Sequence, residues 1–186
     1  MSTVFIFHGI GGNSEENWFP WLKKELEIAG HRAIVPDMPH ADTPKLDEWT
    51  EHMKKYEESI DNETVFVGHS LGGIFALRLL ERMKAAIHAT FLVATVTGPD
   101  DGLEYKSLMT TFTELPLNKE AIKSNAGEIH FLHADNDPYI PLLHAEELAK
   151  KLDGAIEVIL GGEHLSAPGG HTEFPLLLEK ILSVLS

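Results

Sequence analysis

The stretch FVGHSLGGIF, residues 66–75, places a serine between a strand-like run and a helix-like run. Gly68 precedes Ser70 by two residues and Gly72 follows it by two, which matches the pattern G-x-S-x-G. Small residues around one hydroxyl are typical of a tight strand-to-helix turn that exposes a nucleophilic serine. They would also fit a serine that only caps the helix, so the rest of the chain has to decide between the two.

Short apolar runs alternate with longer amphipathic runs along the whole chain, which is the pattern of βαβ units. Six of the short runs are apolar enough to be strands covered on both faces of a parallel sheet. These are residues 3–7, 31–35, 64–67, 89–96, 128–133 and 155–160. The helical period is clearest in 45–60 and in the stripe from 174 to 185. The sequence therefore predicts an α/β fold, with about six mainly parallel strands and helices on both faces of the sheet.

The charge balance argues against two classes of partner. The chain has 15 basic and 29 acidic residues, and the resulting net charge of −14 repels nucleic-acid phosphates and anionic membranes. It has no cysteine, which excludes a disulfide, a thiolate metal site and a cysteine nucleophile. The first residues, MSTVFIFHGIGG, predict a strand rather than a signal peptide, and no run approaches the ~18 apolar residues of a membrane span. We therefore expect a single cytoplasmic, soluble domain over residues 1–186.

Two further polar residues follow predicted strands in an informative order. Asp137 lies in the loop after 128–133, and His164 lies in the loop after 155–160. The chain order serine, aspartate, histidine, each just past a strand end, is that of the α/β-hydrolase catalytic triad. A serine becomes nucleophilic when a neutral imidazole takes its proton, and a carboxylate orients that imidazole. The sequence thus predicts Ser70 as nucleophile, His164 as base and Asp137 as the acid.

Each of the last two assignments has a neighbouring rival. Asp135 lies in the same loop as Asp137, but Pro138 stiffens the backbone at Asp137, whereas Asp135 is free to accept backbone N–H groups two residues on. His171 competes with His164, yet it follows a Pro-Gly-Gly bend and comes directly before a predicted helix start. We favour Asp137 and His164.

Acyl transfer also requires backbone donors aimed at the developing oxyanion. The N–H of Leu71, at the start of the helix after Ser70, is one candidate. The second donor is expected from the glycine-rich loop FHGIGGN after the first strand, where we favour the N–H of Ile10 over that of Gly11.

Four segments together resemble a known family: HGIGG at 8–12, GHSLGG at 68–73, DNDPYIP at 135–141 and GGEHLSAPGGHTEFP at 161–175. They look like the small, capless α/β-hydrolases related to retinoblastoma-binding protein 9 and the bacterial YdeN-type hydrolases. The resemblance spans nearly the whole chain and implies a three-layer serine hydrolase fold with a minimal cap. It also implies the triad Ser70, Asp137 and His164. The first loop and the LSAPGG insert at 165–170 depart from the family, which bears on the shape of the acyl pocket. Because the substrates of family members are poorly defined, the resemblance implies a reaction type and not a substrate.

A metal hydrolase is one rival function, because the chain has eleven histidines. No H-E-x-x-H pair occurs, and His130 and His133 lie an odd number of residues apart on a strand, hence on opposite faces. We expect no metal ion.

A dinucleotide site is a second rival. Gly9-x-Gly11 followed by Asp37 imitates the glycine fingerprint of such sites, but Ser14 stands at the third glycine and Glu15 and Glu16 follow it. We therefore expect no bound cofactor. A hydrolase-like binding module without turnover stays open as an alternative.

The predicted function is that of an esterase-like serine hydrolase acting on a small acyl substrate. Ester, thioester and amide cleavage share this chemistry, and the sequence does not indicate an oligomeric state. The turn-rich stretch 97–127 forms either a small cap or a helix-bearing excursion.

Overall fold

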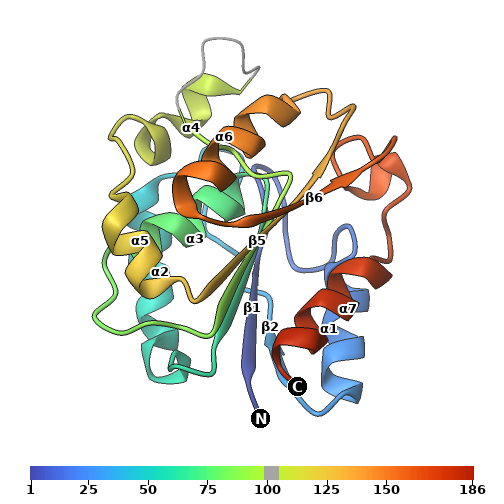
Figure 1. Ribbon diagram of the computed structural model, residues 1–186. Coiled ribbons are helices and arrows are strands. Elements are labelled where there is room, and N and C mark those ends of the chain that lie inside the picture. Colours follow the sequence, from blue (N-terminus) through green and yellow to red (C-terminus); the bar gives the residue numbers. More distant parts are fainter. Residues whose placement is uncertain (99–104) are drawn as a thin grey trace.

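The computed structural model describes residues 1–98 and 105–186, which form one parallel sheet flanked by helices (Figure 1). The strands are β1 (Thr3–Phe7), β2 (Arg32–Ile34), β3 (Val65–His69), β4 (Ala89–Val93), β5 (Glu128–Ala134) and β6 (Ala155–Ile159). The α-helices are α1 (Phe19–Ile28), α2 (Leu46–Met53), α3 (Leu71–Leu80), α4 (Lys106–Thr113), α5 (Lys119–Asn125), α6 (Leu142–Leu152) and α7 (Pro175–Val184). Two short 3₁₀-helices are η1 (Lys54–Ser59) and η2 (Ala167–Gly169). The strand order is β2-β1-β3-β4-β5-β6, with every neighbouring pair parallel.

The helices cover both faces of the sheet, as the sequence predicts. In Figure 1, α1 and α7 lie together on one side, and α2, α3, α5 and α6 lie on the other. The residues of β1 alternate between the two cores: Val4 and Ile6 pack on the α1 side, whereas Phe5 and Phe7 pack on the α3 side. Because both faces are buried, the strand is a continuous apolar run rather than an alternating one.

Most predicted elements differ from the structure by a few residues at their ends, and three of these differences have a visible cause. The strand predicted for 64–67 continues to His69, because Gly68 and His69 pair with β4. The strand predicted for 89–96 ends at Val93, since Ala94 has a positive φ of 44°. The helix predicted for 45–60 is α-helical only to Met53 and continues as η1.

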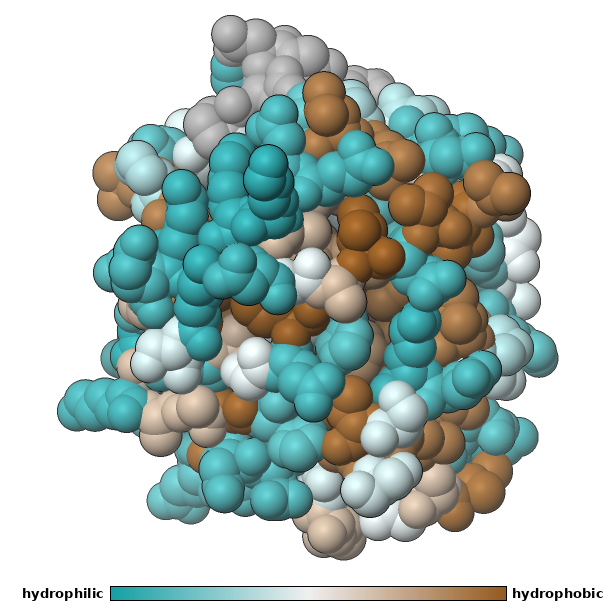
Figure 2. Space-filling view, viewed as in Figure 1, coloured by the Kyte–Doolittle hydropathy of each residue, from teal (hydrophilic) through white to brown (hydrophobic). Residues whose placement is uncertain are grey.

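The stretch 97–127 carries α4 and α5, which agrees with a helix-bearing excursion; its part at 99–104 lies outside the described residues. Within the described ranges, no helix has the length and apolar character needed to cross a bilayer. The face shown in Figure 2 is largely hydrophilic, with one group of apolar side chains at the upper right, near the end of β6, and others at the centre and the lower right. Val158 and Leu160 are exposed at this edge of the sheet.

Candidate active site

Ser70 lies in a sharp turn between β3 and α3, with φ 55° and ψ −120°. The turn depends on backbone contacts that only glycine permits. A Cβ on Gly72 would lie 2.2 Å from the carbonyl oxygen of Phe7, and one on Gly68 would lie 2.4 Å from the Cα of Gly73. A positive φ at a residue other than glycine is strained, and such strain is typical of functional turns. The predicted tight turn around Ser70 is therefore present.

The backbone of Ser70 is fixed by the segment that follows β4. Its N–H donates to the carbonyl of Val93 at 2.9 Å, and its carbonyl accepts from the N–H of Val96 at 3.2 Å. Between these two bonds the chain turns out of the strand at Ala94, whose φ is 44°, so β4 ends earlier than its apolar run. The side chain of Ser70 faces the β1 loop, since a Cβ on Gly9 would lie 3.4 Å from its Oγ.

Asp137 and His164 form a hydrogen-bonded pair. Nδ1 of His164 lies 2.9 Å from Oδ2 of Asp137, whose side chain is fully buried. Oδ1 of the same carboxylate accepts the N–H groups of Tyr139 at 2.9 Å and Ile140 at 3.0 Å. An ionised carboxylate only accepts hydrogen bonds, so Nδ1 of His164 carries the proton and Nε2 of the neutral ring is left as an acceptor.

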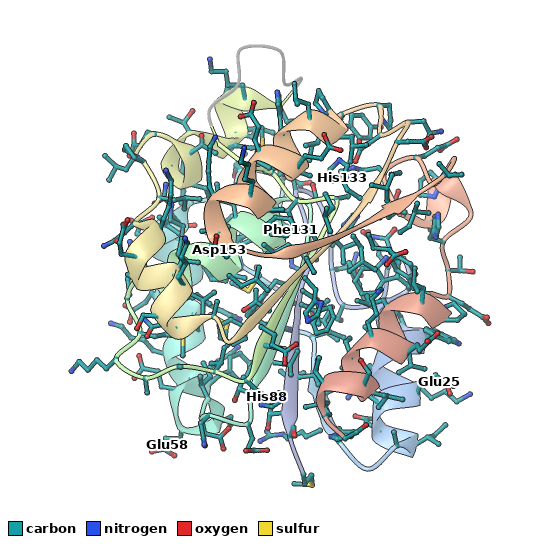
Figure 3. The ribbon with its side chains drawn as sticks, viewed as in Figure 1. Glu25, Glu58, His88, Phe131, His133 and Asp153 are labelled. Atoms are coloured by element: carbon teal, nitrogen blue, oxygen red, sulfur yellow. The ribbon has the colours of Figure 1, made fainter. Side chains whose placement is uncertain are left out.

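The environment of Asp137 favours its ionised form. Burial raises the pKa of the carboxyl group, but the hydrogen bond and charge of His164, with the two backbone donors, outweigh burial and hold that pKa below its ordinary value. Nε2 of His133 lies 3.6 Å from Oδ2 of Asp137. Figure 3 labels His133 near the carboxyl end of β5.

Asp135 does not contact His164 in this way. Its Oδ1 accepts the N–H of Gly161 at 2.8 Å. The expected acceptance from a backbone N–H two residues on is therefore wrong for Asp135, and it occurs at Asp137 instead, through Tyr139. His171 contacts the ring of Phe174 at 5.5 Å and is not among the residues that line the cavity beside Ser70.

The loop that carries His164 is held by side chains from distant parts of the chain. Three of its residues, Gly161, Glu163 and Leu165, have positive φ, so the loop needs external support. The carbonyls of His164 and Leu165 accept from Nε2 of His69 and Nε1 of Trp18, each at 2.9 Å. Three backbone N–H groups of the loop donate to side-chain Oδ1 atoms at 2.8 Å: Gly161 to Asp135, Glu163 to Asn136, and Ala167 to Asn17. We call these five side chains the loop clamp.

The loop clamp could not be predicted from the residue pattern. The bonds from Trp18 and His69 join residues 147 and 95 positions apart, and neither residue type marks such a partner. His69 is buried, and burial, followed by the nearby His164, lowers its pKa to about 3. It is thus neutral, and its Nε2–H is a permanent donor.

The glycine-rich loop after β1 lines the cavity through Gly9, Ile10 and Gly12, and it contains both predicted second donors, Ile10 and Gly11. The N–H of Gly11 already donates to the carbonyl of Ala41 at 2.8 Å, which leaves Ile10 as the available candidate. In the described part of the chain, the N–H groups of Ile10 and Leu71 have no acceptor. His8 fixes this loop, because its Nδ1–H donates to the carbonyl of Gly9 at 2.8 Å while its Nε2 accepts from the N–H of Met38 at 3.0 Å.

Asp37, which completes the imitation of a dinucleotide fingerprint in the sequence, has another role in the structure. Oδ1 of Asp37 accepts the N–H of Ser14 at 2.6 Å, and Oδ2 accepts its hydroxyl at 3.2 Å. Asp37 therefore holds the loop before α1. Over residues 1–98 and 105–186, no group of three or more histidine or carboxylate side chains could hold a metal ion.

Ser70 and His164 line one cavity of about 730 Å³ at the carboxyl ends of the strands. Ile10 and Tyr139 also line it, and the ring of Tyr139 lies 4.9 Å from that of His164. The cavity therefore brings together the loops after β1, β3, β5 and β6. This is where open α/β sheets bind ligands.

Comparisons with known proteins agree with this architecture. The model of the serine hydrolase family matches residues 4–183. The chain is 28% identical over 183 residues to YdeN of Bacillus subtilis, covering 98% of this chain and 96% of that protein. It is 29% identical over 188 residues to the serine hydrolase RBBP9 of Rattus norvegicus, covering 100% of this chain and 96% of RBBP9.

Solved structures give the same result. The crystal structure of the ydeN gene product from B. subtilis matches with a TM-score of 0.93, covering 99% of this chain and 98% of that one. Est1E from Butyrivibrio proteoclasticus, at 16% identity and a TM-score of 0.74, covers 99% of this chain and 88% of its own, and shares the fold alone. These likenesses confirm the resemblance carried by the sequence motifs.

Proposed function

Because this chain belongs to the serine hydrolase family and is therefore a hydrolase, we propose that it cleaves small acyl esters or related acyl bonds through an acyl-enzyme on Ser70. His164 is the general base and Asp137 the carboxylate that orients it. The observation that carries the proposal is the 2.9 Å hydrogen bond between His164 and the buried Asp137, beside the cavity that Ser70 also lines.

The reaction follows from the protonation states of these groups. Nε2 of His164 takes the proton of the Ser70 hydroxyl while Oγ attacks the carbonyl carbon of the substrate. The imidazolium gives that proton to the leaving group, and the acyl group stays on Ser70. A water molecule, deprotonated by the same imidazole, then releases the acid. Asp137 stays ionised throughout, in agreement with its lowered pKa.

Two backbone donors are assigned to the oxyanion. Leu71 is the first residue of α3, so its N–H belongs to the positive end of that helix. The N–H of Ile10 is held by the bond from His8 to the neighbouring carbonyl of Gly9. Preorganised donors of this kind contribute about 10²- to 10³-fold each to turnover.

The test is hydrolysis of p-nitrophenyl esters from acetate to decanoate by the wild type and by Ser70→Ala. We expect activity on the shorter esters, and a loss of about 10⁴- to 10⁶-fold in Ser70→Ala with circular dichroism unchanged. Ser183→Ala, a substitution on the exposed side of α7, is the matched control and should keep full activity. Undiminished turnover by Ser70→Ala would contradict the proposal.

A further inference from the structure

The cavity beside Ser70 has one apolar wall. Val96, Met109 and Ile140 line it, and each is at most 4% exposed. All three belong to the core cluster that packs around α3, so this wall is a rigid continuation of the core rather than a mobile rim. Tyr105, just before α4, extends the wall toward solvent.

The opposite wall is polar. Its polar side chains are Glu15, Glu16 and Asn17 from the loop before α1, and Ser166 and Thr172 from the segment around η2, which also contributes Ala167 and Pro168. Oδ1 of Asn17 accepts the N–H of Ala167 at 2.8 Å, so the two segments form one surface. None of the described residues that line the cavity is a lysine or an arginine.

The two walls come from opposite sides of the sheet. Figure 1 shows α4 above the α3 side and the segment leading to α7 above the α1 side. Ser70 and His164 line the same cavity as both walls. A substrate attacked at Ser70 therefore extends one of its two parts toward each wall.

The position of His164 decides which part goes where. As general acid, this histidine must reach the oxygen of the leaving group, so the leaving group lies on the side of the loop that carries it. That loop continues directly into Ser166, which belongs to the polar wall. The acyl part is then left with the apolar wall.

From this geometry we propose the substrate class: an ester whose acyl group is apolar and whose leaving group is polar and carries no negative charge. The inference rests on the proposed function, because it takes Ser70 as nucleophile and His164 as its base. The carboxylates of Glu15 and Glu16, in a protein of net charge −14, disfavour an anionic leaving group and attract a cationic one.

Three esters of similar size test the orientation: butyrylcholine, its uncharged isostere 3,3-dimethylbutyl butyrate, and butyl 4-(trimethylammonio)butyrate, in which the cation lies on the acyl side. Each kcat/KM is divided by the rate of hydroxide-catalysed hydrolysis of the same ester. We expect butyrylcholine to exceed the reversed ester by about tenfold or more, and its uncharged isostere by about threefold to tenfold.

Two variants assign the walls. Glu15→Gln/Glu16→Gln should abolish the preference for butyrylcholine over its isostere. The control Glu57→Gln/Glu58→Gln removes the same two charges from exposed residues of η1, far from the cavity, where Figure 3 labels Glu58, and should keep that preference. Met109→Ala removes side-chain volume from the apolar wall and so widens the cavity there. It should shift the preferred acyl chain to a longer one without changing the preference for butyrylcholine over its isostere.

The outcomes separate this inference from the proposed function. If the uncharged ester is not hydrolysed in a Ser70-dependent way, the proposed function fails. If it is hydrolysed but the reversed ester is as good a substrate as butyrylcholine, or the double glutamate variant keeps the wild-type preference, only the orientation is overturned.

Discussion

Asp135 and Asp137 lie two residues apart, yet their side chains make contacts that give them different roles. In Asp137→Asn the amide can donate to His164 and stabilise the wrong tautomer, so we expect turnover to fall about 10⁴-fold with the fold intact. In Asp135→Asn the retained Oδ1 can still accept the N–H of Gly161, so the loss should be small. After circular dichroism has shown that both variants fold, their rates of ester hydrolysis decide which aspartate orients His164. An inactive Asp135→Asn beside an active Asp137→Asn would reverse the assignment.

We expect His69 to act on the reaction through His164, as a positioning residue, because its Nε2 donates to the carbonyl of His164. His69→Phe keeps a ring in the core but leaves the carbonyl of His164 without its donor, so we expect kcat to fall about tenfold with KM little changed. His69→Gln keeps an N–H donor and should restore most of kcat. Equal losses in the two variants would show that His69 only fills space.

The sequence could predict the three candidate catalytic residues because each follows a strand whose apolar run is visible. Their roles stay predictions until the variants above are assayed. The loop clamp could not be predicted, since Asn17 and Trp18 meet the His164 loop across 150 and 147 residues. The choice of Ile10 over Gly11 also needed the structure, because only the fold shows that Gly11 is bonded to Ala41.

At the level of elements, the contact of α3 with β1 depends on Gly72. In Gly72→Ala the added methyl group would lie 2.2 Å from the carbonyl oxygen of Phe7, so α3 must move away from the sheet and carry Ser70 with it. We expect a lower melting temperature and loss of activity. Gly169→Ala is the matched control, because its Cβ would lie 3.2 Å from the nearest atoms, Cβ and Oε2 of Glu163, and not 2.2 Å from a backbone oxygen. A wild-type melting temperature and activity for Gly72→Ala would contradict the close approach.

The strands were easier to predict than the helix ends. The strand at 3–7 is confirmed at both ends, because both faces of β1 are buried and the run stops at polar residues. The change from α2 to η1 left no trace in the pattern, since Met53 and Tyr56 are three residues apart, a spacing that suits an α-helix and a 3₁₀-helix alike. The run 89–96 overstated β4 because Val96 is buried as a loop residue.

For the molecule as a whole, buried neutral histidines make stability depend on pH. Burial is the main cause of the lowered pKa of His8, His69 and His133, and that of His69 falls to about 3. Below pH about 6.5 the unfolded chain takes up protons that the folded chain refuses, so the free energy of unfolding falls as the pH falls. Each such histidine contributes a slope of up to about 1.4 kcal/mol per pH unit.

Urea unfolding between pH 7.5 and 5 measures this slope. His69→Gln should reduce this slope by up to about 1.4 kcal/mol per pH unit. The reason is that His69 stays neutral in the folded state over the whole pH range. A free energy of unfolding that is constant over this range would contradict the burial of neutral histidines.

Ser70 is the proposed nucleophile, and covalent labelling with a fluorophosphonate decides whether this side chain is activated. The reagent phosphonylates a serine whose proton is removed by a neighbouring base, so it requires the activated side chain and not a particular substrate. Intact mass and peptide mapping should show one adduct per chain, on Ser70, and none in Ser70→Ala. An adduct on another residue, or labelling of Ser70→Ala at the wild-type rate, would contradict the account.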